Sequence, residues 1–181
     1  MNIEFLSEFK HTTEARWRDR PINPDIYGFQ IQPGTRWNPG LPNSAIAEYE
    51  RILAVRFPFD FSAFLGEMNG TDLPTLNVYG SRGMPSTEGV GVYSFPRDIE
   101  LVKQRIEDVR SLRNEITANL SEQGVDLPDQ AGLVPIYSHR FVVCAEGRES
   151  SAVLSISGAD AIVYGDSLQE CLTREFLNTS G

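Results

Sequence analysis

Prolines and glycines enclose two short helical segments between residues 37 and 70, and no other stretch restricts the fold as strongly. A helix before residue 43 is excluded by Pro39, Gly40 and Pro42. Asn43 or Ser44 is expected to cap the helix that begins there. Apolar residues then recur at steps of three and four, which predicts one buried face made of Ile46, Tyr49, Ile52, Leu53 and Phe57. We therefore expect a short helix that packs on a larger body.

A second helix is predicted directly after Pro58. The residue before a proline is displaced from helical geometry, so Pro58 ends the first helix, and Asp60 is expected to cap the second. The buried face of this second helix is predicted to contain Phe61, Phe64, Leu65 and Met68. Asn69 and Gly70 tolerate positive φ and should end the helix.

Several short motifs follow one another in this stretch at characteristic spacings. They are Trp-Asn-x-Gly-Leu from residue 37, Tyr-Glu at 49–50, Phe-Pro-x-Asp-Phe-x-x-Phe-Leu from residue 57, and Asn-Gly at 69–70. Their order resembles the SMI1/KNR4 family, also called the SUKH superfamily. Residues 153–177 look like the closing strand pair and last helix of that family, and residues 133–137 like its central strand. Matching positions are Trp37, Gly40, Leu41, Tyr49, Glu50, Phe57, Pro58, Asp60, Phe61, Phe64, Leu65, Asn69 and Gly70.

The resemblance implies a fold and a class of function. The fold is α+β, with a mixed, largely antiparallel sheet of about five or six strands flanked by helices. Bacterial members commonly act as immunity proteins that bind and neutralise a toxin domain, whereas fungal members act in cell-wall and signalling regulation. The resemblance thus implies a non-catalytic protein-binding module without a cofactor, most closely a bacterial immunity protein. The alternative is an intracellular scaffold or regulatory protein with the same fold.

The rest of the chain fits one domain, residues 1–181, with residues 1–36 as an N-terminal helix and connector and 97–123 as an inserted long helix. The N-terminal helix is expected at 3–20. Short strands are predicted near 27–31, 76–79 and 90–95.

Residues 98–123 carry the longest helical pattern, with Asp98 as the expected cap. Its apolar positions are Ile99, Val102, Ile106, Val109, Leu112, Ile116 and Leu120. This face packs on its own domain or, as the alternative, forms a homodimer or partner contact.

Four strands are predicted after this helix, at 133–137, 140–146, 151–157 and 161–165, joined as an antiparallel meander. Turns are expected at Gly147–Glu149 and Gly158–Asp160. Ser167 and Glu170 have the spacing of a capping box, which predicts a final helix docked on the sheet.

The composition is that of an acidic protein, whose surface serves either to keep the chain soluble or to bind a partner. The formal net charge is −9, and residues 124–181 hold eight acids and three bases. An acidic surface attracts a basic partner and repels a phosphate backbone, which excludes nucleic acid as the expected ligand. No apolar run is long enough to cross a bilayer, and the first residues lack the pattern of a signal peptide, so we expect a soluble cytoplasmic protein without a membrane partner.

Candidate catalytic and metal-binding groups are few. The two cysteines, Cys144 and Cys171, lack a CxxC pattern and are expected to be buried thiols. Of the two histidines, His139 is beside Ser138, but neighbours on a strand point to opposite faces, so a catalytic pair is not expected. Trp17 and Trp37 are interpreted as packing anchors. The sequence therefore predicts a protein that is not an enzyme and holds no cofactor or metal.

Residues at predicted turns and loops are the candidate partner contacts. They are Asp72 after the helix pair, Tyr137, His139 and Arg140 at the hairpin, and Asp160 and Asp166 at the ends of the last strand. The alternative for each is an ordinary role in turn formation. The expected partner is a basic toxin domain.

Overall fold

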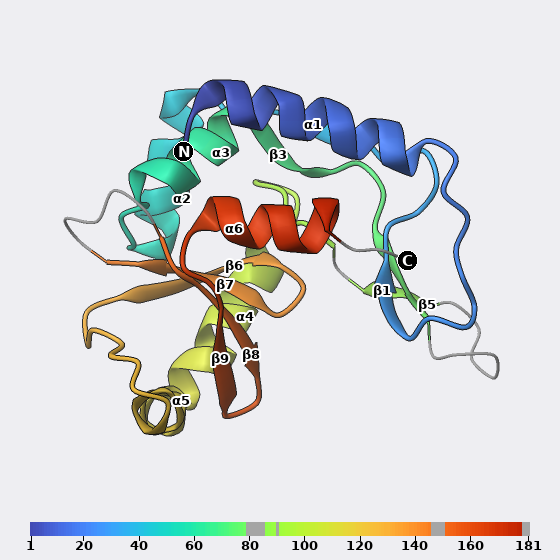
Figure 1. The fold of residues 1–181 in the computed structure, drawn as a ribbon. Helices are drawn as coiled ribbons and strands as arrows, with labels where there is room; N and C mark the ends of the chain where they lie inside the picture. Colours follow the sequence, from blue (N-terminus) through green and yellow to red (C-terminus); the bar gives the residue numbers. More distant parts are fainter. Residues whose placement is uncertain (79–85, 90, 146–150, 179–181) are drawn as a thin grey trace.

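The computed structural model describes residues 1–78, 86–89, 91–145 and 151–178 and shows a mixed α+β chain (Figure 1). The helices are α1 Ile3–Trp17, α2 Asn43–Leu53, α3 Phe59–Glu67, α4 Ile99–Ser111, α5 Arg113–Glu122 and α6 Leu168–Leu172, which continues as a π-helical turn, η2, at Thr173–Leu177. The strands are β1 Gly28–Gln30, β2 Trp37–Pro39, β3 Met68–Thr71, β4 Thr75–Val78, β5 Ser86–Gly89, β6 Gly132–Tyr137, β7 Arg140–Cys144, β8 Val153–Ser157 and β9 Asp160–Gly165.

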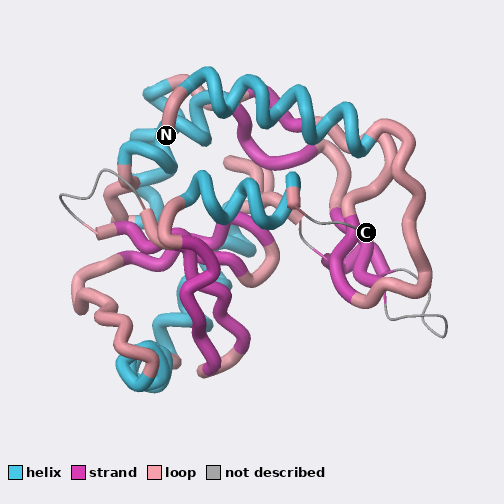
Figure 2. Tube along the Cα trace, in the orientation of Figure 1, coloured by secondary structure: helices cyan, strands magenta, loops and turns pink. Residues whose placement is uncertain are grey.

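The strands of the described residues form three antiparallel sheets (Figure 2). β6, β7, β8 and β9 make a four-stranded meander, β1, β4 and β5 make a second sheet, and β2 pairs with β3. The α+β class and the meander are therefore confirmed, whereas the single sheet of five or six strands is wrong. The turn expected at 147–149 lies outside the described residues, and the one at 158–160 is present.

Residue 90 of the strand expected at 90–95 lies outside the described residues, and residues 91–95 form only a bridge because side chains bind their backbone. Val92 makes a single bridge to Tyr137, which places it at the free edge of β6. Beyond it, Ser94 N donates to Asp98 Oδ2 at 2.8 Å, and Phe95 N donates to Asn69 Oδ1 at 2.9 Å. The chain thus leaves the sheet after a few residues, and β6, expected at the centre, is the outermost strand of the named sheet.

Helices cover both faces of the meander. Successive residues of a strand point to opposite faces, so Val142 and Cys144 enter one core cluster and Phe141 and Val143 enter the other. The first cluster lies under α6 and the α2–α3 pair, and the second lies under α5 (Figure 1).

Trp37 lies at the centre of the first cluster. Its ring is 5.3 Å from the Trp17 ring centroid, 5.9 Å from that of Phe64 and 5.8 Å from that of Phe176. Its indole Nε1 donates to Thr13 Oγ1 at 2.8 Å, which satisfies the one polar atom of the ring. Both tryptophans are buried, so the prediction that they anchor the packing is confirmed.

α2 begins at the predicted residue but ends at Leu53, where Ala54 is left-handed, so Phe57 lies outside the helix; α3 ends at Glu67, and Met68 begins β3. The caps also differ from those predicted. Pro42 and Pro58 occupy the N-cap positions, and neither provides a side-chain hydrogen bond. Asn43 starts α2 without capping it. Asp60 lies inside α3, 1% exposed, and its carboxyl accepts hydrogen bonds from Ser151 N at 2.9 Å and Ser151 Oγ at 2.6 Å. The Asp60 carboxyl, which the sequence predicts to cap α3, therefore joins α3 to the start of β8.

The long helix predicted at 98–123 is broken at Leu112. A straight helix of 26 residues would be about 39 Å long, whereas four strands ~4.8 Å apart span only about 14 Å. The break lets α4 lie against β6 and α5 lie against β9. All seven apolar positions of the segment belong to, or pack against, the two core clusters. That apolar face is therefore used within the chain.

Other predicted elements are close to their observed bounds. α1 ends at Trp17, three residues before the expected end; β1 lies inside the predicted strand at 27–31, and β4 begins one residue before the strand predicted at 76–79. The capping box is present, because Glu170 N donates to Ser167 Oγ at 3.1 Å, although the Glu170 carboxylate accepts from Asp166 N at 2.8 Å. Among the described residues, no helix is both long and apolar enough to cross a bilayer.

Candidate functional site

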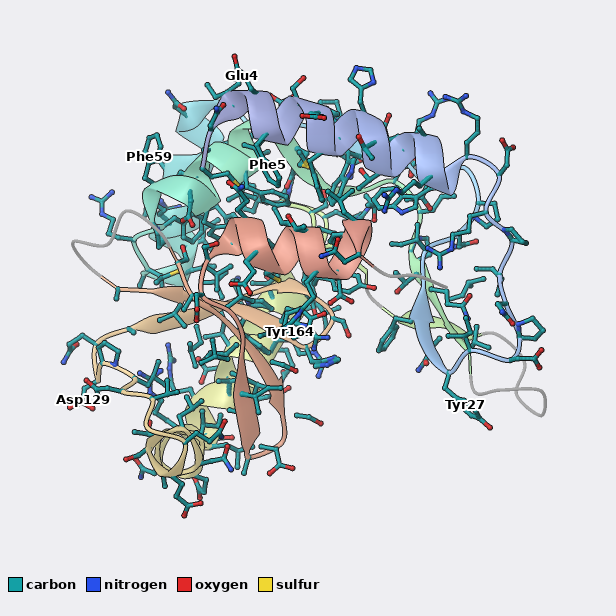
Figure 3. All side chains as sticks on the ribbon, viewed as in Figure 1. Glu4, Phe5, Tyr27, Phe59, Asp129 and Tyr164 are labelled. Carbon is teal, nitrogen blue, oxygen red and sulfur yellow. The ribbon has the colours of Figure 1, made fainter. Side chains whose placement is uncertain are left out.

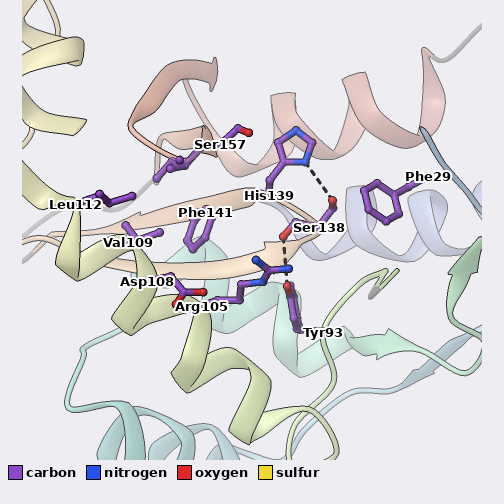
Figure 4. Close-up of a pocket in the computed structure, with 12 residues that line it drawn as sticks. Phe29, Tyr93, Arg105, Asp108, Val109, Leu112, Ser138, His139, Phe141 and Ser157 are labelled. Atoms are coloured by element: carbon purple, nitrogen blue, oxygen red, sulfur yellow. Dashed lines mark hydrogen bonds between the residues drawn. The ribbon is translucent and has the colours of Figure 1, made fainter. Parts of the chain in front are cut away.

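A cavity of about 400 Å³ lies beside the turn between β6 and β7 (Figure 4). Phe29 comes from β1, Val109 from α4 and Leu112 from the break after α4. Ser138 and His139 come from the β6–β7 turn, Ser157 and Gly158 from the end of β8 and the turn after it, and Tyr93 from the segment beside β6. Residues far apart in the sequence therefore share one concave surface, as binding pockets usually require.

The β6–β7 turn brings Ser138 and His139 together, against the sequence-based reasoning. Ser138 has φ +48°, a left-handed conformation that is uncommon for a residue other than glycine. Its Oγ lies 3.1 Å from His139 Nδ1, and its carbonyl oxygen accepts from Tyr93 Oη at 3.2 Å. The expectation that the two side chains point to opposite faces is wrong, because they lie in a turn and the alternation of a strand does not apply.

Burial and neighbouring charge set the electrostatics of this turn. Burial, followed by the charge of Arg140, lowers the pKa of His139 below its usual 6.5, although Glu175 opposes the shift. The imidazole is therefore neutral at pH 7. Burial raises the pKa of Tyr93, and the nearby charge of Arg105 opposes that rise. Figure 4 shows Arg105 and Tyr93 pointing toward one another.

The arrangement provides groups for recognition. Hydroxyl, imidazole and guanidinium groups line the pocket together with aromatic and aliphatic side chains. The carboxylate in the lining, Asp108, accepts a hydrogen bond from Gln104 Nε2 at 2.9 Å. A general base is normally oriented by an acid that hydrogen-bonds to its ring, and Asp108 is instead held by Gln104.

Among the described residues, the cysteines and the other potential metal ligands lie apart from one another or are buried. Within the described part of the chain, no three His, Cys, Asp or Glu side chains are placed to hold a metal ion. Cys144 and Cys171 are free and buried, as predicted. Burial raises the pKa of both thiols, that of Cys171 to about 12, so both remain protonated at neutral pH.

Tyr137 and Arg140, two of the predicted contacts, are engaged inside the chain. Tyr137 is buried, with its ring 5.1 Å from that of Phe176. Arg140 donates to Ser155 Oγ at 2.7 Å and to Glu175 Oε2 at 3.3 Å. Its guanidinium also lies 3.7 Å from the centroid of the Tyr164 ring. Arg140 thus ties the meander to the C-terminal helix, and it presents little surface to a partner.

The predicted acidic contacts are exposed but do not form one surface. Asp72 Oδ1 accepts from Arg36 N and Leu73 N, each at 2.8 Å, at the far end of the β2–β3 pair. Asp160 begins β9 and Asp166 follows its end, so about 20 Å of extended chain separates them. Of the six candidates, only Tyr137, His139 and Arg140 lie together.

The structure forms an acidic surface that shares Asp160 alone with the six predicted contacts. Gln123 Nε2 donates to Ala161 O at 2.8 Å, and Ala161 N donates to Asn119 Oδ1 at 3.1 Å, which fixes the β8–β9 turn against α5. Asp160 is thereby placed beside the exposed acids of α5 and of the connector that follows. We define the acidic end as Glu115, Glu122, Asp126, Asp129 and Asp160, all exposed. Figure 1 shows α5 and the β8–β9 pair, and Asp129 is labelled in Figure 3.

One feature of the sequence could have identified this surface. No lysine or arginine occurs from residue 114 to residue 139, although four of the five acids lie there. Arg113, just before this run, donates to the carbonyls of Pro128 at 2.7 Å and Ala131 at 3.1 Å and so holds the connector on α5. The contribution of Asp160 depends on tertiary packing and could not be read from the sequence.

Comparison with protein families, curated proteins and solved structures found no match for this chain. The structure is that of a mixed α+β protein with a pocket at the β6–β7 turn and an acidic end. Its resemblance to the SMI1/KNR4 family rests on the order of the motifs and stays a prediction.

Proposed function

We propose that this chain is a non-catalytic protein-binding module that acts in the cytoplasm as an immunity protein and neutralises a basic toxin domain through its acidic end. The observation that carries the proposal is that hydrogen bonds dock the β8–β9 turn on α5, so that exposed carboxylates of α5, the connector and this turn lie on neighbouring segments. The Arg113 guanidinium, held by backbone carbonyls at the base of this surface, acts on Asp129 and offsets one of the five negative charges.

Electrostatics explains why such a surface favours a basic protein. Exposed charges of one sign attract an oppositely charged partner over a distance on the order of 8–10 Å at physiological salt and raise the association rate. They also repel phosphate, which opposes nucleic-acid binding. The acidic end therefore supports a basic partner, which is the chemistry expected from the composition.

The SMI1/KNR4 assignment is part of the same proposal, and packing at the motif positions supports it. Trp37 is the centre of the aromatic cluster. Gly40 lies so close to α3 that an added Cβ would be 1.9 Å from the Gly66 carbonyl oxygen. Asp60 connects α3 to the meander. These motif residues thus have structural roles, as expected of positions that define a fold.

The scaffold alternative relies on residues 98–123 as a partner helix. Its apolar side chains pack into the two clusters of the chain itself. We therefore place the partner surface on the acidic end.

The test begins with capture of partners by the tagged chain from its native lysate, followed by purification of any basic protein encoded beside it. Titration calorimetry then compares the wild type with two variants of equal charge. One replaces Glu122, Asp126 and Asp160 by their amides, and the control replaces the exposed acids Glu8, Asp19 and Asp25. At ~0.5 kcal/mol for each exposed charge pair, the first variant should weaken binding about tenfold at low salt.

The control variant should bind like the wild type, and high salt should reduce the difference between the two variants. Equal effects of the two variants would assign the attraction to overall charge and refute the acidic end. Capture of housekeeping proteins alone, with no toxic neighbour, would favour the scaffold function.

A further inference from the structure

The pocket at the β6–β7 turn has two kinds of wall. One is apolar, formed by Phe29, Val109, Leu112, Phe141 and Ile156. The other is polar, formed by Arg105, Ser138, His139 and Ser157. In Figure 4, Phe29 and Phe141 lie on either side of the Ser138–His139 turn. A ligand that fits both walls has an apolar body and a polar group at one end.

The polar wall is richer in donors than in free acceptors. Arg105 is the one lysine or arginine among the described lining residues, and it takes part in none of the ion pairs between described residues. Asp108 is engaged by Gln104. When Ser138 Oγ donates to His139 Nδ1, the neutral ring carries its proton on Nε2 and becomes another donor. These groups suit an anion.

Tyr93 positions this wall. It is 5% exposed, its hydroxyl holds the Ser138 carbonyl at 3.2 Å, and it lies beside Arg105. The Tyr93 hydroxyl thus stabilises the unusual left-handed conformation of Ser138. Pre-organised donors bind an anion without a cost of reordering.

We propose that this pocket binds a small organic carboxylate, whose acid group pairs with Arg105 and whose apolar body lies against Phe29 and Phe141. A guanidinium recognises a carboxylate through two parallel hydrogen bonds. The volume of about 400 Å³ is sufficient for a bicyclic ring with one acid group. This site adjoins the acidic end, since its Ser157 pairs with Asp160 across the β8–β9 turn, but its binding groups are different residues.

The probe is 2-naphthoate, and the uncharged 2-naphthamide is its matched control. Titration of the ¹⁵N-labelled chain by NMR should show saturable shifts at the β6–β7 turn and α4 with the acid and much weaker binding of the amide. Arg105→Gln should weaken naphthoate binding about tenfold or more, because a charge-assisted pair is lost. Arg110→Gln, on the same helix but paired with Glu107, should leave binding within about twofold.

Phe29→Ala provides a second variant that does not touch the charge. It should weaken the acid and the amide to a similar degree, since both lose the same ring contact. Absence of saturable binding of naphthoate at millimolar concentration would overturn the proposal. Equal affinity for naphthoate and naphthamide would overturn it as well. So would unchanged naphthoate binding by an Arg105→Gln variant whose ¹⁵N spectrum shows that it is folded.

Discussion

Asp60 lies on the buried side of α3, and Asp60→Ala should strongly lower the free energy of unfolding. The carboxyl is 1% exposed and accepts from Ser151 N at 2.9 Å, Ser151 Oγ at 2.6 Å and Phe61 N at 2.8 Å. Its removal leaves the buried Ser151 amide and hydroxyl without this acceptor, at ~1–3 kcal/mol each. We expect a loss of about 3 to 4 kcal/mol in the free energy of unfolding, a large part of the ~5–15 kcal/mol typical of a domain.

Urea unfolding measures this loss. With a slope of ~2 kcal/mol/M, the midpoint should fall by about 1.5 to 2 M at unchanged slope. Asp72→Ala is the matched control, because Asp72 also accepts from two backbone amides but is exposed, so water replaces it at a cost of about 1 kcal/mol or less. In a double-mutant cycle with Ser151→Ala, the two substitutions should not add. A loss below about 1 kcal/mol for Asp60→Ala would refute the buried link.

Three further predictions concern packing, charge and pH. Gly40→Ala should lower the free energy of unfolding by more than about 3 kcal/mol, because the added Cβ meets the Gly66 carbonyl. Gly66→Ala, where there is open space, should raise it by about 0.5 to 1 kcal/mol. Chemical denaturation compares the two variants. Arg140→Ala should lower Tm by about 5 to 10 °C by calorimetry, since it leaves the 16% exposed Glu175 without its Arg140 partner. The folded chain resists protonation of His139, so stability should fall as the pH drops below 6.5, and His139→Gln should reduce this slope in urea titrations at several pH values.

Local sequence signals were sufficient for most of the helices and strands. The proline-bounded pair at α2 and α3 and the four strands of the meander follow from apolar periodicity and turn residues, which act over short distances. The capping box at Ser167 also depends only on residues nearby. Such features are visible in one sequence because their partners are adjacent in the chain.

Features that depend on distant contacts were not predictable. Asp60 has the sequence of a helix cap, but its partner Ser151 is 91 residues away. The break at Leu112 reflects the width of the sheet below it, and the apolar run around Val92 loses its strand to Asn69 and Asp98. Each outcome is decided by tertiary packing that overrides local preference.

The same limit applies to the candidate sites. His139 was singled out by its position at the predicted hairpin, and the structure places it in the pocket. Phe29 and Arg105 were not, because their elements meet this turn only in the folded chain. The acidic end likewise combines a run of sequence without lysine or arginine with Asp160. Hydrogen bonds between α5 and Ala161 bring Asp160 close to that run.

Protection of cells is the most direct test of the central claim. The neighbour-encoded basic protein captured by this chain would be expressed alone, with the wild type, or with the variant neutralised at Glu122, Asp126 and Asp160, and survival would be counted. The account predicts death without the chain, survival with the wild type and partial loss of protection with the variant, while the Glu8, Asp19 and Asp25 control protects fully. Equal survival with and without the chain would contradict it.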